Sequence, residues 1–403
     1  MLIIQKYGGA TLENPEKIKA VARQISDLKN QGQQVVVIVS AMGQTTNQLL
    51  NLSQQVSKNP LLRELDMLLS VGERISMSLV SMALNDLNHH AISLTGSQAG
   101  IMTDESHVNA MITDVKAHRV IEALSENKIV IIAGFQGVNP INKEITTLGR
   151  GGSDTSAVAI AAFLKADRCE ILKDVSGIFS ADPKLITTAK LISKLNYSIL
   201  LEMTYWGAKV LHYRSVELAF ANKVNLFIGL AHTKISDNNI NLKNGTLINE
   251  DTMFETTRPI SVNSHKNIFQ ILIKNKSQIE SIEALNENFK RNQIGTPQIL
   301  LGITNNNETS LFVTAPDEIM VLIKDFCLKN TDYKIENENL CSVSLTCTGS
   351  SLNEVLIQCQ KKLSEEKIQT KYFIQSAMSL NFFIDQSQKN QAVQSLHSLI
   401  NLT

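Results

Sequence analysis

The sequence predicts an α/β protein with a mostly parallel central sheet between helices, followed by two smaller α+β units. Short apolar runs alternate with amphipathic stretches through the first half, which is the order of strands and helices around a parallel sheet. The run Q-V-V-V-I-V-S over 34–40 is too continuous for a strand with one face in water. After about Leu230 the residue pattern changes, and predicted strands and helices recur in two weakly similar units.

Each element follows from its hydrophobic period. In the first half, strands are predicted at 2–4, 34–40, 91–94, 128–132 and 170–172, and helices at 15–28, 64–85 and 155–165. The last of these helices is rich in alanine and apolar on most faces, so we expect it to be buried. In the second half, strands are predicted at 268–273, 310–314, 341–346, 372–375 and 379–384, and helices at 277–292, 316–329, 353–366 and 389–400. The turn-rich stretch 236–245 is expected at a linker edge, and 330–339 as an exposed connection.

Composition excludes several classes of protein. The 403 residues include 38 Lys+Arg and 38 Asp+Glu, so the net charge is zero, which argues against a nucleic-acid binder or a polybasic membrane-surface protein. No apolar run approaches the ~20 residues of a membrane span. The 5 cysteines form no CxxC pair, as expected for reduced thiols in the cytoplasm. We therefore expect a cytoplasmic protein with no nucleic-acid or membrane partner.

A glycine pair stands where the first strand meets the first helical segment. The sequence there is K-Y-G-G-A-T, from Lys6 to Thr11. Glycines at a strand end let backbone N–H groups approach an anion, and a neighbouring lysine can reach phosphate oxygens. Since such a pair is more often a plain turn, this motif alone does not decide between the two.

A second segment, G-R-G-G-S-D-T-S over 149–156, precedes the helix that we expect to be buried. Its glycines could turn the chain and its hydroxyls could cap the helix. That interpretation leaves Arg150 and Asp154 at the mouth of one loop unexplained, so we expect an anion site here. The segment is not a Walker loop, because no GxxxxGK[ST] occurs.

Further polar residues follow or flank the predicted strands. S-A-M-G-Q-T-T-N over 40–47 follows the central strand, where open parallel sheets bind ligands, although its threonines could equally be helix caps. Glu73 lies inside a predicted helix, where an acid is usually solvated, while the adjacent Gly72 indicates close approach by another segment. The loop 173–184 carries two lysines and two aspartates. The segment 207–212 contains Lys209 and His212; taken alone, the lysine would be a surface residue and the histidine a hydrogen-bonded structural residue.

Together and in this order, the segments resemble the aspartate kinases, within the amino-acid kinase family. The resemblance runs through about residues 1–228, and its pieces are K-Y-G-G-A-T, V-S-A-M-G-Q-T-T-N, L-L-S-V-G-E-R, S-L-T-G-S-Q-A-G-I, A-G-F-Q-G-V, T-T-L-G-R-G-G-S-D-T-S-A, K-D-V-S-G-I-F-S-A-D-P-K and G-A-K-V-L-H-Y-R-S-V-E-L-A. The two C-terminal units resemble paired ACT domains, with a weaker match. The resemblance implies an amino-acid kinase fold over 1–232, a linker over 233–262, and ACT-like domains over 263–335 and 336–403. In this family one ACT module is commonly inserted within the other, so interleaving stays open.

The resemblance implies a reaction. In this family the γ-phosphoryl group of MgATP moves to the side-chain carboxylate of L-aspartate, giving 4-phospho-L-aspartate, the first step of lysine, threonine and methionine biosynthesis. A carboxylate nucleophile is already ionised at neutral pH, so catalysis requires positioning and neutralisation of phosphate charge and no general base. ACT modules imply a homodimer or a larger homo-oligomer. A lysine or threonine effector at these modules is a hypothesis that rests on the domain resemblance alone.

Carried over residue by residue, the resemblance also implies site roles. Lys6, with Gly8 and Gly9, would hold the transferring phosphates, and Asp154 would orient Lys6. Arg150 would pair with the α-carboxylate of aspartate, and Glu73 with its α-ammonium. No metal-ligating residue is expected, because Mg²⁺ would come with the phosphates of ATP. The remaining positions are Ser40 and Thr46 toward the substrate, and Lys173, Asp174, Phe179, Lys184 and Lys209 toward the nucleotide.

Some positions depart from the family pattern. Phe179 lacks the phenol hydroxyl that is usual there, and Lys184 stands for an arginine and cannot make a bidentate phosphate contact. The positions expected to contact the nucleotide thus match the family pattern less well than those expected to bind aspartate. Two alternatives therefore stay open. One is a kinase that acts on another carboxylate substrate; Glu73 and Arg150 instead favour an α-amino acid. The other is a catalytically weak ACT-domain amino-acid sensor, against which the intact Lys6, Glu73, Arg150 and Asp154 argue.

Overall fold

A computed structural model describes residues 1–231, 245–250, 257–274, 277–291, 297–305, 308–349 and 351–400. The chain forms two compact units. Unit 1 consists of Met1–Ile178, Leu191–Thr204 and Lys209–Thr252, and unit 2 of Phe179–Lys190, Tyr205–Ala208 and Met253–Thr403. Apart from Gly245, the stretch 236–245 that we expected at a linker edge lies outside the described residues.

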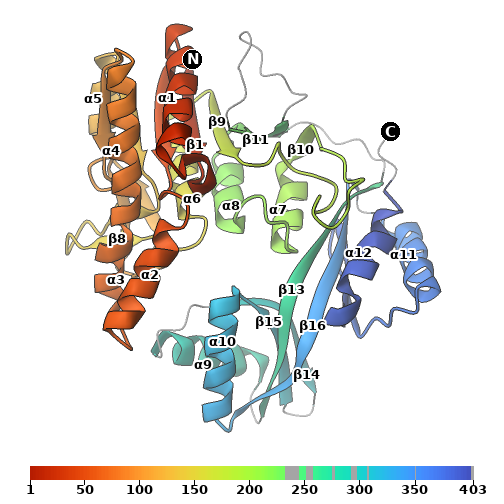
Figure 1. Cartoon of the computed structure of the whole chain (residues 1–403). Coiled ribbons are helices and arrows are strands. Elements are labelled where there is room, and N and C mark those ends of the chain that lie inside the picture. The colour runs from red at the N-terminus through yellow and green to blue at the C-terminus, as the bar shows by residue number, and fades with distance from the viewer. Residues whose placement is uncertain are drawn as a thin grey trace. The chain divides into compact units, whose positions relative to one another are not determined.

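Unit 1 is built on an eight-stranded sheet (Figure 1). All neighbouring strands in it are parallel, except for β11 and β12. The predicted central strand is confirmed, since every residue of β2 after Gln34 is buried. In spatial order the strands are β10 (Lys194–Asn196), β12 (Gly245–Asn249), β11 (Leu226–Leu230), β9 (Arg168–Lys173), β1 (Leu2–Tyr7), β2 (Gln34–Val39), β6 (Ile129–Ala133) and β3 (Ala91–Leu94).

Helices cover this sheet on both faces. On one face, α1 (Pro15–Asn30) and α4 (Val71–Asp86) pack against a core that includes Val35, Val37 and Val39. From the other face α6 (Gly152–Leu164), the helix predicted to be buried, contacts β1, β2 and β9, and its first ten residues are buried. The remaining helices are α2 (Thr45–Val56), α3 (Leu62–Leu69), α5 (His118–Ser125), α7 (Tyr197–Tyr205) and α8 (Tyr213–Ala221), with a 3₁₀ turn at Gly9–Leu12.

The single helix predicted over 64–85 is wrong, because α3 and α4 meet at Ser70. The Ser70 carbonyl accepts a hydrogen bond from Gln136 Nε2 (2.9 Å), which competes with the helical ladder there. The close approach indicated by Gly72 is confirmed, since a Cβ there would lie 2.8 Å from Ala41 Cβ. By length and composition alone α3 and α4 taken together, Leu62–Asp86, could cross a membrane, but half of their most apolar 18-residue window is buried inside the protein, as in a core helix.

A four-stranded sheet completes unit 1. None of its strands was predicted, because these short segments mix polar and apolar residues and lack the continuous apolar runs that marked the predicted strands of similar length. Its last strand leads directly into the segment 149–156. In spatial order the strands are β5 (Ile112–Val115), β4 (Ile101–Thr103), β7 (Gln136–Val138) and β8 (Ile145–Thr147).

Unit 2 is a six-stranded sheet in which all neighbours are antiparallel. The two predicted α+β modules are present, and the two long strands β13 (Pro259–Lys274) and β16 (Tyr333–Cys347) are shared between them. One helix pair packs on a core with Ile271 and Tyr333, the other on a core with Val262 and Leu345, at opposite ends of the long strands (Figure 1). In spatial order the strands are β14 (Gln298–Asn305), β15 (Glu308–Thr314), β13 (Pro259–Lys274), β16 (Tyr333–Cys347), β18 (Ser379–Asp385) and β17 (Tyr372–Gln375). The helix pairs are α9 (Gln278–Arg291) with α10 (Asp317–Lys329), and α11 (Asn353–Glu365) with α12 (Lys389–His397), which follows a 3₁₀ turn at Gln386–Gln388.

The exposed connection expected over 330–339 is wrong from Tyr333 onward. This stretch is the first half of β16, where Tyr333 lies opposite Ile273 and Ile335 opposite Ile271. The asparagines suggested a loop, but pairing with the neighbouring strand decides the conformation.

All five cysteines are buried free thiols, as expected. Burial raises the pKa of Cys327 to about 11 and that of Cys341 to about 12, so these thiols stay protonated and unreactive at neutral pH.

Candidate active site

The centre of the site is a buried carboxylate between two lysines. Lys6 Nζ lies 2.7 Å from Asp154 Oδ1, and Lys173 Nζ lies 3.3 Å from Asp154 Oδ2. Lys173 also donates a hydrogen bond to the carbonyl of Val210. Two cations on one carboxylate leave a net positive charge in a place that excludes most water.

The sheet brings these three side chains together. Lys6 stands near the end of β1 and Lys173 ends the adjacent parallel strand β9, so both reach the same edge of the sheet. Asp154 lies in the first turn of α6, the helix that packs beneath these strands. Beyond Lys6 the backbone stays close to β9, because Gly8 N–H donates to Leu172 O (3.2 Å).

Burial and charge act together on the acid–base properties of this cluster. Burial lowers the pKa of Lys6, although Asp154 opposes the effect. Burial alone would raise the pKa of Asp154, but Lys173 and Lys6 outweigh it and hold that pKa at about 2. Asp154 is therefore ionised at any physiological pH.

Close packing explains Gly9, the second glycine after β1. A Cβ at Gly9 would lie 2.7 Å from the carbonyl oxygen of Ala41, in the loop that follows β2. The two loops are joined by a hydrogen bond from Gly43 N–H to Gly9 O (3.0 Å). The pair is thus more than a plain turn: it brings the loops after β1 and β2 into contact beside Lys6.

Glu73 faces the same loop from the first turn of α4. Its side chain is buried, and its Oε1 accepts a hydrogen bond from Ala41 N–H (3.0 Å). Its Oε2 is buried and has no hydrogen-bond partner among the described residues. Burial raises the pKa of Glu73 to about 8, while Lys6 acts in the opposite direction. A buried carboxyl group with one oxygen that lacks a hydrogen-bond donor can bind a cationic group of a ligand.

The arginine of segment 149–156 is held between two glycines in left-handed conformation. Gly149 has φ 73° and Gly151 has φ 72°. A Cβ at Gly151 would lie 2.3 Å from His212 Cβ, so only glycine fits at this contact. Arg150 between them is exposed. The cap of α6 is Gly151 itself, and no side-chain hydroxyl caps this helix.

Arg214, at the start of α8, fixes the backbone before Arg150. Its guanidinium donates to Leu148 O (3.0 Å), Ala110 O (2.8 Å) and Asn109 Oδ1 (2.9 Å). Such a fork ties two chain segments together.

A second anchor is Asp66 of α3, whose side chain is fully buried. It accepts hydrogen bonds from Thr147 Oγ1 (2.5 Å) and from Val108 N–H (3.0 Å), and its Oδ2 lies 2.6 Å from His107 Nδ1. Burial raises the pKa of Asp66, and these hydrogen bonds oppose the rise. Asp66 and Arg214 together hold the backbone just before Gly149, at Thr147 and Leu148, against the neighbouring segment 107–110.

Sequence reasoning missed both anchors. Arg214 stands within the quoted segment G-A-K-V-L-H-Y-R-S-V-E-L-A and was given no role, and Asp66 was not singled out at all. The available signal for Asp66 was an acid within the apolar stretch L-D-M-L-L, since an acid there is rarely buried unless it is paired.

The other predicted residues are distributed over both units. In unit 1, Ser40 N–H donates to Tyr7 O (3.1 Å), and Thr46 lies in the first turn of α2, whose cap is Gln44 and not a threonine. Asp174 and Lys209 are exposed and flank the Lys173–Val210 contact in the chain. His212 caps α8 by accepting from Arg214 N–H (3.4 Å), as its structural interpretation suggested. Phe179 and Lys184 belong to unit 2.

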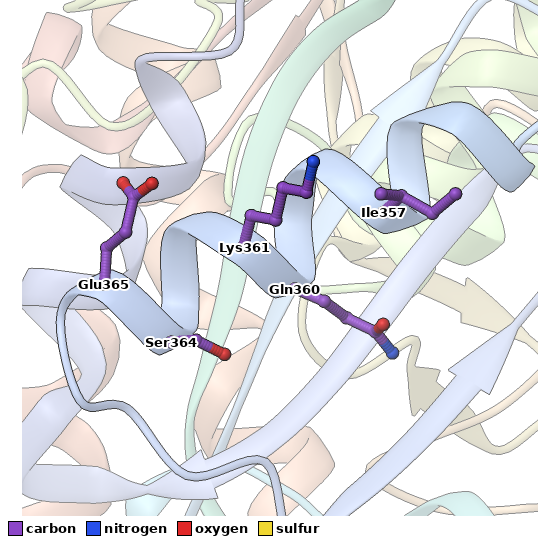
Figure 2. A pocket seen from close by; sticks show the side chains of 5 residues that line it. All are labelled: Ile357, Gln360, Lys361, Ser364 and Glu365. Atoms are coloured by element: carbon purple, nitrogen blue, oxygen red, sulfur yellow. The ribbon is translucent and has the colours of Figure 1, made fainter.

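No other described feature competes for this chemistry. No three His, Cys, Asp or Glu side chains gather into a metal-binding group among the described residues. Figure 2 shows a depression whose five lining residues all belong to the one helix α11, so it is an open helix surface; they are Ile357, Gln360, Lys361, Ser364 and Glu365.

Comparisons with known proteins point to one family. The profile of the amino acid kinase family matches residues 1–229. An aspartokinase of Geobacillus stearothermophilus is 36% identical over 410 residues, covering 100% of this chain and 97% of that protein. An aspartokinase of Corynebacterium glutamicum is 53% identical over 225 residues, 56% of this chain and 53% of that protein, so the alignment spans about half of that relative.

Solved structures share the fold of the whole chain. Crystal structures of E. coli aspartokinase III superpose with a TM-score of 0.79 for the complex with aspartate and ADP, called the R-state, at 21% identity and 99% coverage of both chains. The same enzyme in complex with lysine and aspartate, called the T-state, gives a TM-score of 0.70 at 20% identity, covering 99% of this chain and 100% of the other.

Proposed function

Since this chain belongs to the amino acid kinase family and, within it, to the aspartokinases, we propose that it transfers the γ-phosphoryl group of ATP to the side-chain carboxylate of L-aspartate. The product is the acyl phosphate 4-phospho-L-aspartate. The reacting carboxylate of aspartate is already ionised at neutral pH, so the protein must hold two anions together and offset their charge.

The buried lysines supply that positive charge. Lys6 and Lys173 share Asp154, and the backbone around Gly8 and Gly9 runs directly beside them. We assign the transferring phosphates to this place, with Asp154 orienting both ammonium groups. Asp174 and Lys209 flank the same contact in the chain and would complete the nucleotide side. For Phe179 and Lys184 a nucleotide contact rests on the family resemblance alone.

Mg²⁺ would enter with the nucleotide. The donor set fits such an ion only through the phosphates, because Asp154 is already occupied by two lysines and no described cluster could hold a metal. When bound, Mg²⁺ would neutralise phosphate charge, which is its usual contribution to phosphoryl transfer.

The observation that best supports an amino-acid substrate is the buried carboxyl oxygen Oε2 of Glu73, which has no hydrogen-bond partner among the described residues. The other oxygen, Oε1, accepts a hydrogen bond from the N–H of Ala41, the residue after Ser40. An α-ammonium would satisfy Oε2. Arg150, fixed by two glycines and exposed, would take the α-carboxylate in a bidentate pair, and Ser40 and Thr46 would help to place the substrate.

The test is a hydroxamate assay with MgATP and L-aspartate on the wild type, Arg150→Ala and Glu73→Gln. Arg119→Ala, an exposed arginine on α5, is the matched control. We expect aspartate-dependent turnover that both site variants reduce at least tenfold and that the control retains. Turnover with another carboxylic acid and none with aspartate would indicate a different substrate. Nucleotide binding without turnover by any acid would indicate the amino-acid sensor.

Regulation and assembly follow the same premise. The fold that this chain shares with the lysine complex of the E. coli enzyme supports lysine, or threonine in its place, as an effector bound to unit 2. From the likeness to these enzymes we also propose a homodimer or a larger homo-oligomer, and a cytoplasmic location. Saturating lysine and threonine, alone and together, should change activity or thermal stability; no change in either measurement would remove the effector from this proposal.

A further inference from the structure

Tyr205, which ends α7, and the three residues that follow it belong to unit 2 by their contacts. The segment Tyr205–Ala208 places the side chain of Trp206 in the core of unit 2, where it is 3% exposed. Its ring meets Phe383 of β18 edge-on, with centroids 6.4 Å apart and planes at 87°. The same core contains Ile268 of β13 and Phe312 of β15, so Trp206 contacts the middle of the unit 2 sheet.

The backbone on both sides of Trp206 is fixed as well. The carbonyl oxygen of Tyr205 lies 2.9 Å from His265 Nε2 and accepts a hydrogen bond from Gln298 Nε2 (3.1 Å). Gly207 has φ 100°, and a Cβ there would lie 2.6 Å from the backbone carbonyl of Ser264. The segment therefore has little freedom to move independently of β13 and β14.

The chain leads directly from this anchor to the buried lysines. Val210 follows Trp206 by four residues, and its carbonyl accepts a hydrogen bond from Lys173. Lys173 in turn pairs with Asp154, which pairs with Lys6. Four residues span at most about 14 Å, so a displacement of Trp206 can be absorbed only over a short length of chain.

A second segment repeats this arrangement. Phe179–Lys190 also belongs to unit 2, and its Ala181 and Ile186 share a core with Val343 of β16. Ser180 is fully buried, with its Oγ 2.9 Å from His397 Nε2 of α12. This segment contains Phe179 and Lys184, so both segments that lead to proposed nucleotide contacts are anchored in the same unit.

We propose that Trp206 is a positioning residue through which the sheet of unit 2 sets the placement of Lys209 and Val210, and so controls nucleotide binding more than aspartate binding. The inference rests on the proposed function, because it takes Lys173 and Lys209 as nucleotide contacts. It follows from linkage that nucleotide binding must in turn bias the surroundings of Trp206. A change in the sheet of unit 2 then acts on the KM for ATP.

The first test uses the full-length wild-type protein and needs no activity. Trp206 is the only tryptophan, so intrinsic fluorescence excited at the indole band reports on this one position. Titration with ADP should shift or quench its emission, and titration with L-aspartate alone should leave it unchanged. Calorimetry on the same samples shows whether ADP binds. Binding of ADP without a change in emission overturns the inference, whereas absence of ADP binding contradicts the proposed function itself.

The second test separates positioning from general stability. Trp206→Leu removes the edge-on ring contact, and Trp206→Phe retains an aromatic ring. We expect Trp206→Leu to raise the KM for ATP about tenfold with the KM for aspartate within twofold, and Trp206→Phe to restore most of the loss. Phe289→Leu, in the core under α9 and α10, is the matched control for loss of an aromatic ring elsewhere in unit 2. An equal rise in the KM for ATP in that control, or equal rises for both substrates in Trp206→Leu, overturns the inference.

Discussion

The ammonium of Lys6 lies 2.7 Å from the carboxylate of Asp154, and the two side chains are only 7% and 6% exposed. Removing two charges from water costs several kcal/mol per ion, and their mutual attraction repays this only with good geometry and further partners. Here the further partner is a second cation, Lys173, so the pair carries more positive charge than stability requires. Such an excess is useful where an anion of several charges must be held.

Replacement of Asp154 should damage both stability and turnover. In Asp154→Asn the buried Lys6 and the partly buried Lys173 lose their counter-charge, so the free energy of unfolding at pH 7 should fall by about 3–5 kcal/mol. With the ammonium groups misplaced, kcat should fall by about 10²–10³. Urea unfolding and the hydroxamate assay measure the two effects.

The matched control for Asp154→Asn is an exposed pair of nearly the same length. Glu13 and Lys17 lie 2.8 Å apart on the surface, and Glu13→Gln should cost about 1 kcal/mol or less. If Asp154→Asn cost no more than this control, the buried cluster would not be the electrostatic centre that its geometry suggests.

Glu73 should make stability depend on pH. Its pKa is raised by burial from 4.5 to about 8, so between these values the folded protein keeps a proton that the unfolded chain has lost. The free energy of unfolding should therefore fall as the pH rises from 4.5 to 8, by up to about 5 kcal/mol relative to Glu73→Gln. Denaturation curves of both proteins across this window give the difference, and parallel curves would contradict the prediction.

Aspartate should reverse that protonation. The α-ammonium favours the ionised form of Glu73, so binding below pH 8 should release a proton and tighten as the pH approaches 8. Calorimetry of aspartate binding in two buffers of different ionisation enthalpy counts that proton. In Glu73→Gln the release should disappear, and its persistence would place the titrating group elsewhere.

Parts of this site could be predicted because parallel strands end at one edge of a sheet. Lys6 and Lys173 follow separate apolar runs, and that rule places both at one edge of the sheet. Only the pairing of β1 with β9 makes them neighbours, with Asp154 in the helix that packs on these strands. The break between α3 and α4 could not be predicted, because it depends on Gln136, 66 positions away from Ser70. The same holds for Arg214, whose partners lie far away in sequence.

The assignment of segments to units was equally hidden from the sequence. Phe179–Lys190 and Tyr205–Ala208 lie within the stretch that resembles a kinase domain, yet their side chains pack in unit 2. Local composition cannot reveal this, since an apolar residue such as Trp206 indicates burial but not the core in which it is buried.

Arg214 should affect aspartate more than nucleotide. It ties Leu148 O to Asn109 and Ala110, directly before Gly149 and Arg150. Lysine cannot reproduce this fork, so Arg214→Lys should displace Arg150 and raise the KM for aspartate about tenfold, with the KM for ATP within threefold. Steady-state kinetics with each substrate varied give both constants.

The control for Arg214→Lys is the same exchange at Arg119, an exposed position on α5, which should change neither constant. Equal effects on the two substrates in Arg214→Lys would show that the fork supports the fold of unit 1 generally and not the placement of Arg150.

Val108 is strained and should gain stability as glycine. This β-branched residue has φ 66°, a region that such side chains rarely adopt, and it stays there because its N–H donates to both oxygens of Asp66 (3.0 and 3.2 Å). Such strain costs about 1–3 kcal/mol, while glycine loses about 0.5–1 kcal/mol more through its unfolded state. Val108→Gly should therefore stabilise unit 1 by about 1 kcal/mol and raise its Tm by about 2–4 °C. Val108→Ala keeps the disfavoured φ and should show no gain. Thermal unfolding of both variants decides the matter: a lower Tm for Val108→Gly would mean that the packing of the valine side chain outweighs its strain.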